Sequence, residues 1–264
     1  MELNTEKMIS EKEGGIGWMT FNNPARRNAM SLDMWEGVET ILDEFESDDD
    51  IKVIVMRGAG DKAFVSGADI SEFKERRNNA EAAAEYARIS EGARARLMGV
   101  KKPLIAMIQG YCLGGGMAVA MAADMRFATE DSQFGIPAAR LSIAYGYDGL
   151  HKLVHLVGPA MASEIMFTAR RVQPDEAQRI GLINRAVPVD ELEAAVREVA
   201  DAICRNAPLS IAASKHTIGQ ILTDKEDRDY EEIKRMSKTC FDSNDYKEGR
   251  EAFMEKRSPV FTGT

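Results

Sequence analysis

Two short segments rich in small residues could each present a backbone N–H group to a ligand. The first covers residues 66–70, Ser-Gly-Ala-Asp-Ile, and follows a short apolar run. A turn of small residues after a strand can leave a main-chain N–H facing a cleft. A plain connecting turn has the same composition, so both interpretations of this segment stay open.

The second segment, residues 110–116, ends in three consecutive glycines. It separates a run typical of a buried strand from a run typical of a buried helix. The N–H groups at a helix start carry the positive end of the helix dipole, and glycine lets a ligand approach them closely. Such a place suits an anion or a developing oxyanion, although glycine would also allow tight packing of helix on strand. The segment is not GxGxxG and no Lys-Ser/Thr pair follows, so a nucleotide-binding fold is not supported.

Two such N–H groups facing one carbonyl oxygen would form an oxyanion hole. Removing one donor from such a hole typically lowers the rate on the order of a hundredfold or more. The elements around the two segments would have to hold them close together.

Strand-like and helix-like runs alternate through the first half of the chain, which is the order expected of an α/β protein. Apolar runs predict strands at residues 16–21, 52–56 and 104–108. Apolar spacing and alanine-rich composition predict helices at residues 31–45, 80–98 and 117–123. The apolar stretch 103–123 is long enough to cross a bilayer. The glycines that interrupt it favour a buried strand and helix instead, so no membrane association is expected.

The last third of the chain changes character, because no strand pattern follows about Val187. Amphipathic helices are predicted at residues 190–206, 209–222, 230–239 and 245–256. We therefore expect a core at residues 1–189 that carries the active site, and a helical region at residues 190–264. Isolated helices need a surface to bury against, so this second region is expected to mediate oligomerisation.

The composition favours an ordinary globular protein with small-molecule chemistry. The chain has 264 residues and a formal net charge of −9, which argues against nucleic acid or an anionic membrane as a partner. Its three cysteines are widely spaced, which indicates free thiols in a reducing compartment. With only three histidines, a His/Cys metal cluster is not expected. The N-terminus shows no apolar signal-peptide core, so the expected location is the cytoplasm.

Short motifs follow one another in order along nearly the whole chain. They are Asn23-Pro24 with Asn28-Ala29, Lys62-Ala63-Phe64 before Ser66-Gly67-Ala68-Asp69, Gln109-Gly110 with Gly114-Gly115-Gly116, Phe134-Gly135 with Pro137, Val157-Gly158-Pro159-Ala160 with Glu164, Thr168-Ala169-Arg170, Asp175-Glu176-Ala177 with Gly181-Leu182-Ile183-Asn184 and Val187-Pro188, and Glu248-Gly249-Arg250-Glu251-Ala252-Phe253 with Glu255-Lys256-Arg257. This ordered set resembles the enoyl-CoA hydratase/isomerase (crotonase) superfamily, although each motif alone is unspecific.

The resemblance implies an α/β fold made of a spiral of ββα units, with a helical C-terminal trimerisation region. It implies an acyl-coenzyme A thioester as substrate, and therefore no separate cofactor. By position, the backbone N–H groups of Ala68 and Gly115 would form the oxyanion hole. They would polarise the thioester carbonyl and stabilise an enolate. The implied assembly is a homotrimer or a dimer of trimers.

The resemblance also implies where coenzyme A would bind. The positions that match the family's contacts are Ala25, Arg26, Arg27, Lys62, Ala68, Asp69, Ile70 and Ser71, together with Phe253 and Lys256, which would reach coenzyme A from a neighbouring subunit. The cations among them are physically sensible partners for phosphate groups. Without the resemblance, solvated surface charge explains them equally well.

The sequence departs from standard hydratases at the two catalytic glutamates. Ala118 stands at the first position, two residues after the glycine triplet, and Ala138 stands at the second. Alanine has no titratable group, so neither residue can activate water or deliver a proton. Family isomerases commonly need a carboxylate at the second position, so the alanine there also weakens an interpretation as an isomerase.

Two residues of the following loop are candidate replacements. Tyr145 could orient a carboxylate or donate a proton, and Asp148 could act as a base. Alternatively, the tyrosine packs in the core and the aspartate caps the helix that begins near Gly149. Weaker candidates are Glu72, Glu75 and Glu85, in or near an expected lid, and His151 with His155, which are more typical of a helix surface or core.

Three functions remain open. The first is a lyase-type enzyme of the hydratase/isomerase family that acts on an acyl-CoA through a stabilised enolate. The second is a decarboxylase or a carbon–carbon bond hydrolase of the same family, suggested by the missing glutamates. The third is a coenzyme A-binding subunit without catalysis.

Overall fold

The computed structural model describes residues 3–69 and 80–264, which include two sheets. The larger sheet has the order β1-β2-β3-β5-β7-β9, and the smaller has the order β4-β6-β8. Among the strand pairs of these described residues, β1–β2 alone is antiparallel. The strands are β1 (Met8–Glu13), β2 (Ile16–Phe21), β3 (Val53–Gly58), β4 (Ala63–Val65), β5 (Leu104–Ile108), β6 (Tyr111–Leu113), β7 (Met125–Thr129), β8 (Gln133–Gly135) and β9 (Arg185–Val187).

From β3 to β8 consecutive strands alternate between the two sheets, and a helix follows each pair. Strands β3, β5 and β7 lie in the large sheet, and each is followed by a short strand of the small sheet. The α-helices are α1 (Leu32–Ser47), α3 (Ala80–Met98), α4 (Gly115–Ala122), α5 (Tyr147–Thr168), α6 (Pro174–Arg179), α7 (Leu192–Arg205), α8 (Pro208–Ile221), α9 (Tyr230–Asp242) and α10 (Asn244–Glu255). This repeated strand–strand–helix order is the predicted α/β spiral.

Both faces of the large sheet are buried, as is usual for parallel sheets. Alternation along β2 sends Met19 into one core and Trp18 into the other. The first core also contains side chains of α1 and α4, whereas the second is closed by α7 through Leu192, Val196 and Ala200. The first helix of the predicted C-terminal region therefore belongs to the packing of the sheet.

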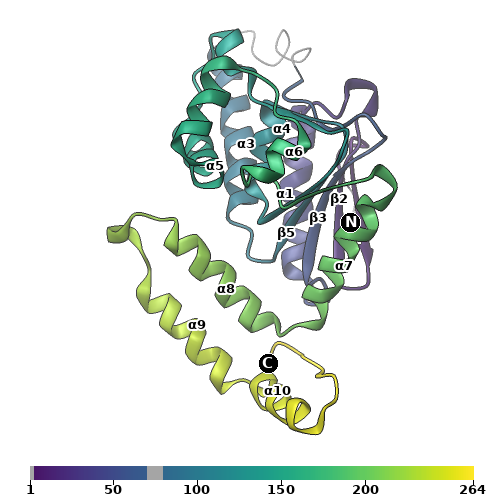
Figure 1. Cartoon of the computed structure of the whole chain (residues 1–264), viewed down its shortest axis with the longest axis vertical. Coiled ribbons are helices and arrows are strands. Elements are labelled where there is room, and N and C mark those ends of the chain that lie inside the picture. The colour runs from purple at the N-terminus through teal and green to yellow at the C-terminus, as the bar shows by residue number, and fades with distance from the viewer. Residues whose placement is uncertain (1–2, 70–79) are drawn as a thin grey trace.

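The remaining C-terminal helices α8, α9 and α10 extend away from the two sheets (Figure 1). Helix α8 is tied to the core by Lys215, whose Nζ donates to a carboxylate oxygen of Asp124 at 2.7 Å and to the carbonyl oxygen of Lys102 at 2.8 Å. Helices α8 and α9 have no buried side chains. These helices would therefore gain burial only from a further surface.

The apolar stretch at residues 103–123 forms β5, β6 and α4 rather than one long helix. Gly114, with φ +53° and ψ −115°, breaks the chain direction just before α4 begins. Among the helices in residues 3–69 and 80–264, none combines the length and the apolar character needed to cross a membrane.

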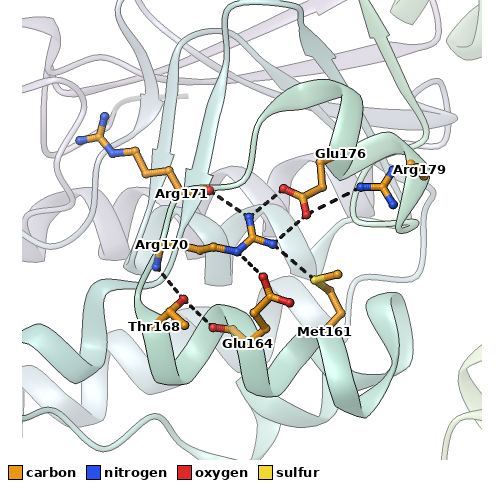
Figure 2. A network of polar contacts seen from close by, with 7 residues as sticks. All are labelled: Met161, Glu164, Thr168, Arg170, Arg171, Glu176 and Arg179. Atoms are coloured by element: carbon orange, nitrogen blue, oxygen red, sulfur yellow. Dashed lines mark hydrogen bonds and ion pairs between the residues drawn. The ribbon is translucent and has the colours of Figure 1, made fainter.

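An ion-pair network joins the end of α5 to α6 (Figure 2). The Arg170 guanidinium donates from Nε to Glu164 at 2.7 Å, and from both Nη atoms to the two Glu176 carboxylate oxygens at 2.7 Å each. The next residues of the chain pair with β8, through mutual backbone hydrogen bonds between Val172 and Phe134. The network therefore supports the strand that leads to Ala138.

Candidate functional site

The two small-residue segments lie beside each other at one pocket. A methyl group placed on Gly115 would lie 3.6 Å from the amide nitrogen of Ala68. Gly67, Ala68 and Gly115 all line a pocket of about 270 Å³. Neither the Ala68 amide nor the Gly115 amide donates a hydrogen bond to any residue that the structure describes. The fold thus brings two available main-chain donors to one cavity.

Backbone hydrogen bonds hold the first segment in place. The Met30 amide donates to the carbonyl oxygen of Gly67 at 2.8 Å, and the Asp69 amide donates to the carbonyl oxygen of Met30 at 2.9 Å. Gly67 adopts φ +127°, a conformation that favours glycine because side chains there are strained. The backbone hydrogen bonds of Gly67 and Asp69 therefore fix Ala68 on both sides. The Ala68 amide itself donates no hydrogen bond to a described residue.

The second segment is positioned by close packing at the start of α4. The Gly114 amide donates to the carbonyl oxygen of Gly135 at 2.8 Å. A methyl group placed on Gly116 would lie 1.9 Å from the carbonyl oxygen of Val65, so only glycine fits. Gly115 is the first residue of α4, where the N–H groups lack helical partners and the dipole is positive.

The buried side chain of Asn28 organises the neighbouring cationic loop. Its Nδ2 donates to the carbonyl oxygens of Ala59 at 3.0 Å and Ala63 at 2.7 Å. These bonds join the loop that carries residues 25–27 to the turn that carries Lys62. A buried side-chain amide that satisfies several main-chain groups fixes both loops relative to each other.

The predicted coenzyme A contacts on these loops are exposed. Ala25 and Arg26 lie in a 3₁₀ turn, η1 (Pro24–Arg26), and Arg27 and Lys62 are also exposed. Arg26 Nε lies 3.7 Å from a carboxylate oxygen of the buried Asp69. The predicted contacts Ile70 and Ser71 lie outside the described residues, as do Glu72 and Glu75.

Tyr111 separates two arginines on the small sheet. The guanidinium carbon of Arg27 lies 5.2 Å from the centre of the Tyr111 ring, and that of Arg171 lies 5.4 Å from it. Arg171 also donates to the Gln133 side chain. Cation–π contacts of this kind orient a guanidinium without neutralising it, so Arg27 keeps its charge for an anion.

Phe253 and Lys256 lie far along the chain, on α10 and at its end. The Phe253 side chain is 83% exposed, and Lys256 ends the helix in the left-handed conformation. Both residues are exposed in the single chain. Neither lines the pocket that contains Ala68 and Gly115.

The positions of the missing glutamates lie on the two elements that flank the second segment. Ala118 lies in α4, one turn after Gly115, and is half-buried. Ala138 is buried in a 3₁₀ turn, η3 (Pro137–Leu141). Neither can take part in proton transfer.

Tyr145 is the candidate replacement with the more informative surroundings. Its ring packs against Gly149, and its hydroxyl is buried without a hydrogen-bond partner among the described residues. Burial raises the pKa of Tyr145 to about 12, while the positive charge of Arg94 acts in the opposite direction. The group is therefore a neutral phenol at physiological pH, and it lies near enough to Arg94 to sense its charge.

The other candidates lie on helix surfaces. Asp148 is exposed in the first turn of α5, where a carboxylate suits the helix dipole. His155 Nδ1 lies 2.8 Å from the carbonyl oxygen of His151, one turn earlier on the same helix. Glu85 pairs with Arg88 at 2.7 Å on the exposed face of α3. Within the described residues, no group of three or more His, Cys, Asp or Glu side chains could hold a metal ion.

Sequence reasoning missed two charged residues of the pocket, Glu91 and Arg94 on α3. The residues of α3 that line the pocket are Tyr86, Ala87, Ser90, Glu91 and Arg94. Their spacing of three or four residues marks one face of the helix. This periodicity was available in the sequence, but nothing in it indicated which face of α3 meets a cavity.

Comparisons with known proteins agree with this fold. The enoyl-CoA hydratase/isomerase family model matches residues 11–264. The chain is 37% identical over 257 residues to a short-chain-enoyl-CoA hydratase of Clostridium acetobutylicum, covering 97% of each protein. It is 33% identical to a crotonyl-CoA hydratase of Syntrophomonas wolfei, covering 97% of this chain and 98% of the relative.

Solved structures give the same result. The crystal structure of an enoyl-CoA hydratase/carnithine racemase from Magnetospirillum magneticum superimposes with a TM-score of 0.92 at 36% identity, covering 99% of this chain and 97% of the other. An enoyl-CoA hydratase from Bacillus anthracis superimposes with a TM-score of 0.91 at 28% identity, covering 98% and 100%. The chain therefore belongs to the enoyl-CoA hydratase/isomerase family of the crotonase superfamily.

Proposed function

We propose that this protein is an enzyme that acts on an acyl-CoA thioester through an enolate held at the Ala68 and Gly115 amides. The observation that carries the proposal is the meeting of these two available N–H groups at one pocket, in a chain of this family. The thioester oxygen would accept both hydrogen bonds. The charge that develops on this oxygen would be stabilised most strongly in the transition state, because the donors are already in place.

Coenzyme A would lie along the cationic loops, with its phosphates near Arg26, Arg27 and Lys62. Asn28 supports this part of the proposal, because it holds those loops together. No separate cofactor is needed, since coenzyme A is part of the substrate. Calorimetry with acetyl-CoA should show binding that weakens as salt is added, because screening reduces attraction between exposed charges. No detectable binding at millimolar ligand would contradict the proposal.

We further propose that the enzyme is not a standard two-glutamate hydratase. Adding water across a double bond requires one group to activate water and another to protonate the α-carbon. Ala118 and Ala138 can do neither, and each such group typically contributes roughly a hundred- to ten-thousandfold. The relatives named as hydratases make hydration the natural first assay, and the missing carboxylates make slow hydration the expected result.

The decisive measurement is the hydration of crotonyl-CoA by the wild-type enzyme. Turnover should be very slow, and the double variant Ala118→Glu/Ala138→Glu should raise it. The Ala118→Gln/Ala138→Gln variant is the matched control, since it adds similar volume without a titratable group. A wild-type turnover of about hundreds per second, well inside the usual enzyme range, would show that other residues supply the acid and base.

A decarboxylase is the second candidate function. Loss of carbon dioxide from a carboxylate placed β to the thioester forms the enolate directly, without a base, and the enolate then needs one proton. The neutral Tyr145 hydroxyl, buried near Arg94, favours this alternative. A screen over enoyl-, 3-hydroxyacyl-, malonyl-type and cyclic oxoacyl-CoA thioesters separates hydration, decarboxylation and carbon–carbon bond hydrolysis. Binding of all these thioesters without turnover would indicate a subunit without catalysis.

We also propose that the chain forms a homotrimer or a dimer of trimers through its C-terminal helices. Large apolar side chains of α9 and α10 are exposed in the single chain, among them Phe241, Phe253 and Met254. They border a groove of about 710 Å³ between the start of α8, α9 and α10. Contiguous apolar surface of this kind marks an interaction site.

A further inference from the structure

The proposed active-site pocket contains an arginine that has no anionic partner in the described chain. Arg94 lines the pocket together with Ala68 and Gly115. Its guanidinium carbon lies 5.8 Å from the centre of the Trp35 ring, and Trp35 lines the same pocket. The guanidinium makes no hydrogen bond or ion pair with any residue that the structure describes. The ring thus places the cation but leaves its N–H donors available.

Glu91, which lines the same pocket, does not neutralise this arginine. Glu91 lies three residues earlier on α3, a spacing that permits an ion pair. No such pair forms, and the Glu91 side chain is exposed to solvent. Elsewhere on α3 an arginine does pair at this spacing, since Arg88 contacts Glu85 at 2.7 Å. A half-buried guanidinium that has no counterion among the described residues is stabilised when an anion binds beside it.

Coenzyme A phosphate is an unsuitable anion for Arg94. The cations proposed to bind the phosphates lie on the loops at residues 25–27 and 62, and none of them lines this pocket. The pocket lined by Arg94 also contains the two amides proposed to hold the thioester oxygen. An anion bound there would therefore belong to the acyl part of the substrate. The volume of about 270 Å³ suits a short acyl part.

We propose that the acyl group carries a free carboxylate, and that Arg94 binds it beside the thioester. The substrate class is then a coenzyme A monothioester of a short dicarboxylic acid. A planar guanidinium can donate two parallel hydrogen bonds to one carboxylate, which gives both affinity and orientation. The carboxylate would lie in the same pocket as the two amides, because Ala68, Gly115 and Arg94 all line it. This inference rests on the proposed function, because it assumes that the thioester lies at Ala68 and Gly115.

The test compares two thioesters of four-carbon acids, succinyl-CoA and butyryl-CoA, by calorimetry. Succinyl-CoA ends in a carboxylate, whereas butyryl-CoA ends in a methyl group. The wild-type protein should bind succinyl-CoA at least about tenfold more tightly, as expected for a charge-assisted pair in a pocket. In Arg94→Met the ratio of the two affinities should fall to about one. Arg94→Lys should keep part of the preference, because it keeps the charge but loses the planar arrangement.

Arg88→Met is the matched control, because it removes a cation from the exposed face of the same helix. It should keep the wild-type ratio. Circular dichroism of each variant verifies folding, and Arg94→Lys carries the test if Arg94→Met does not fold. A wild-type ratio near one, or a ratio that survives in both Arg94 variants, overturns the carboxylate proposal alone. Failure of both thioesters to bind the wild-type protein overturns the proposed function itself.

Discussion

At the scale of single residues, the proposed site offers main-chain donors, and Tyr145 is the candidate for its proton chemistry. The Tyr145 hydroxyl is buried and has no partner among the described residues. A buried hydroxyl without a partner is unfavourable for the folded state. Such a group is therefore more readily explained by chemistry or ligand binding than by stability.

Replacing Tyr145 by phenylalanine should separate stability from activity. The variant should be as stable as the wild-type protein, or more stable by up to about 1 kcal/mol, because it removes an unsatisfied polar group. Turnover of the preferred thioester should fall by at least about tenfold if the hydroxyl donates a proton or orients a carboxylate. Denaturant unfolding and steady-state kinetics measure the two effects, with Tyr147→Phe, an exposed neighbour, as control. Unchanged turnover would remove Tyr145 from the mechanism. Asp148→Asn tests in the same way whether Asp148 acts as a base.

The pH dependence of Tyr145 has a definite sign. Burial raises its pKa to about 12, above the ordinary value near 10. The folded state therefore favours the neutral phenol, so its contribution to stability is complete below about pH 10 and is lost as pH rises toward the folded pKa. Ultraviolet titration of the wild-type protein, minus that of Tyr145→Phe, should show no tyrosinate near pH 10. A difference signal with a midpoint at that pH would mean that the hydroxyl is solvated.

Asn28 should matter for stability and for ligand binding together. Asn28→Ala removes two side-chain hydrogen bonds to main-chain carbonyls and one from the Asn23 amide. Because buried groups are left unpaired, the free energy of unfolding should fall by about 2–4 kcal/mol. Acetyl-CoA affinity should fall as well, since these hydrogen bonds no longer hold the two cationic loops together. Asn22→Ala removes an exposed asparagine bond nearby and is the control. Equal stability of the two variants would contradict this role.

At the scale of elements, the sequence predicted the long buried pieces and missed the short ones. Strands β2, β3 and β5 and helix α1 lie close to the predicted ranges, because continuous apolar runs and helical spacing are strong signals. Strands β4, β6 and β8 have three residues each, too few for a period to show. Strand β1 is a largely exposed edge strand whose polar sequence hides it.

The same contrast holds for the candidate site. The segments around Ala68 and Gly115 were singled out by their small residues, and the ordered set of motifs along the chain then favoured a role in binding over a plain turn. Glu91 and Arg94 could not be placed, because α3 is alanine-rich and charged on several faces. Only the packing of α3 beside α1 and α4 decides which face meets the pocket. The helix expected to begin near Gly149 is α5, and inside it Gly158 leaves helical geometry with φ +78° just before Pro159.

The junction between α5 and α6 supports an element-scale prediction. Arg170→Met should destabilise the fold by about 1 kcal/mol, a figure reduced for the partial exposure of the network. Hydrogen bonds from Arg170 hold the pKa of Glu176 below its ordinary value. That contribution is present above the unfolded pKa of about 4 and is lost as pH falls through the folded value. Urea unfolding at neutral and acidic pH measures it. Arg179→Met is the control, because Arg179 contacts the same carboxylate only at 3.9 Å. A larger effect of Arg179→Met would refute this assignment.

At the scale of the whole molecule, the compact spiral contrasts with the extended C-terminal helices (Figure 1). Helix α7 belongs to the core, whereas α8, α9 and α10 present apolar surface outward. Phe253, which is 83% exposed, belongs to that surface and is also a predicted coenzyme A contact from a neighbouring subunit. Oligomerisation and substrate binding are therefore expected to be linked.

Charge placed on this surface should dissociate the assembly. Phe253→Asp should convert trimers to smaller species at micromolar concentration, because an unpaired charge is costly to bury in an interface. Acetyl-CoA affinity should fall in parallel if a neighbouring subunit contributes to the site. Val189→Asp, which alters an exposed apolar residue outside the helical surface, should leave both properties unchanged. Light scattering that shows a wild-type monomer would refute the assembly.

The two donors proposed to hold the thioester oxygen have a consequence for how such an enzyme can change over time. Every amino acid except proline carries a main-chain N–H, so no point substitution at Ala68 or Gly115 other than to proline deletes the donor itself. The acidic positions have no such protection, since a single codon change removes a carboxylate. A lineage of such enzymes could therefore lose both acids, which is the proposal for Ala118 and Ala138, and still inherit the main-chain donors that stabilise an enolate. New reactions can then evolve through substitutions around the two main-chain donors, which stay in place.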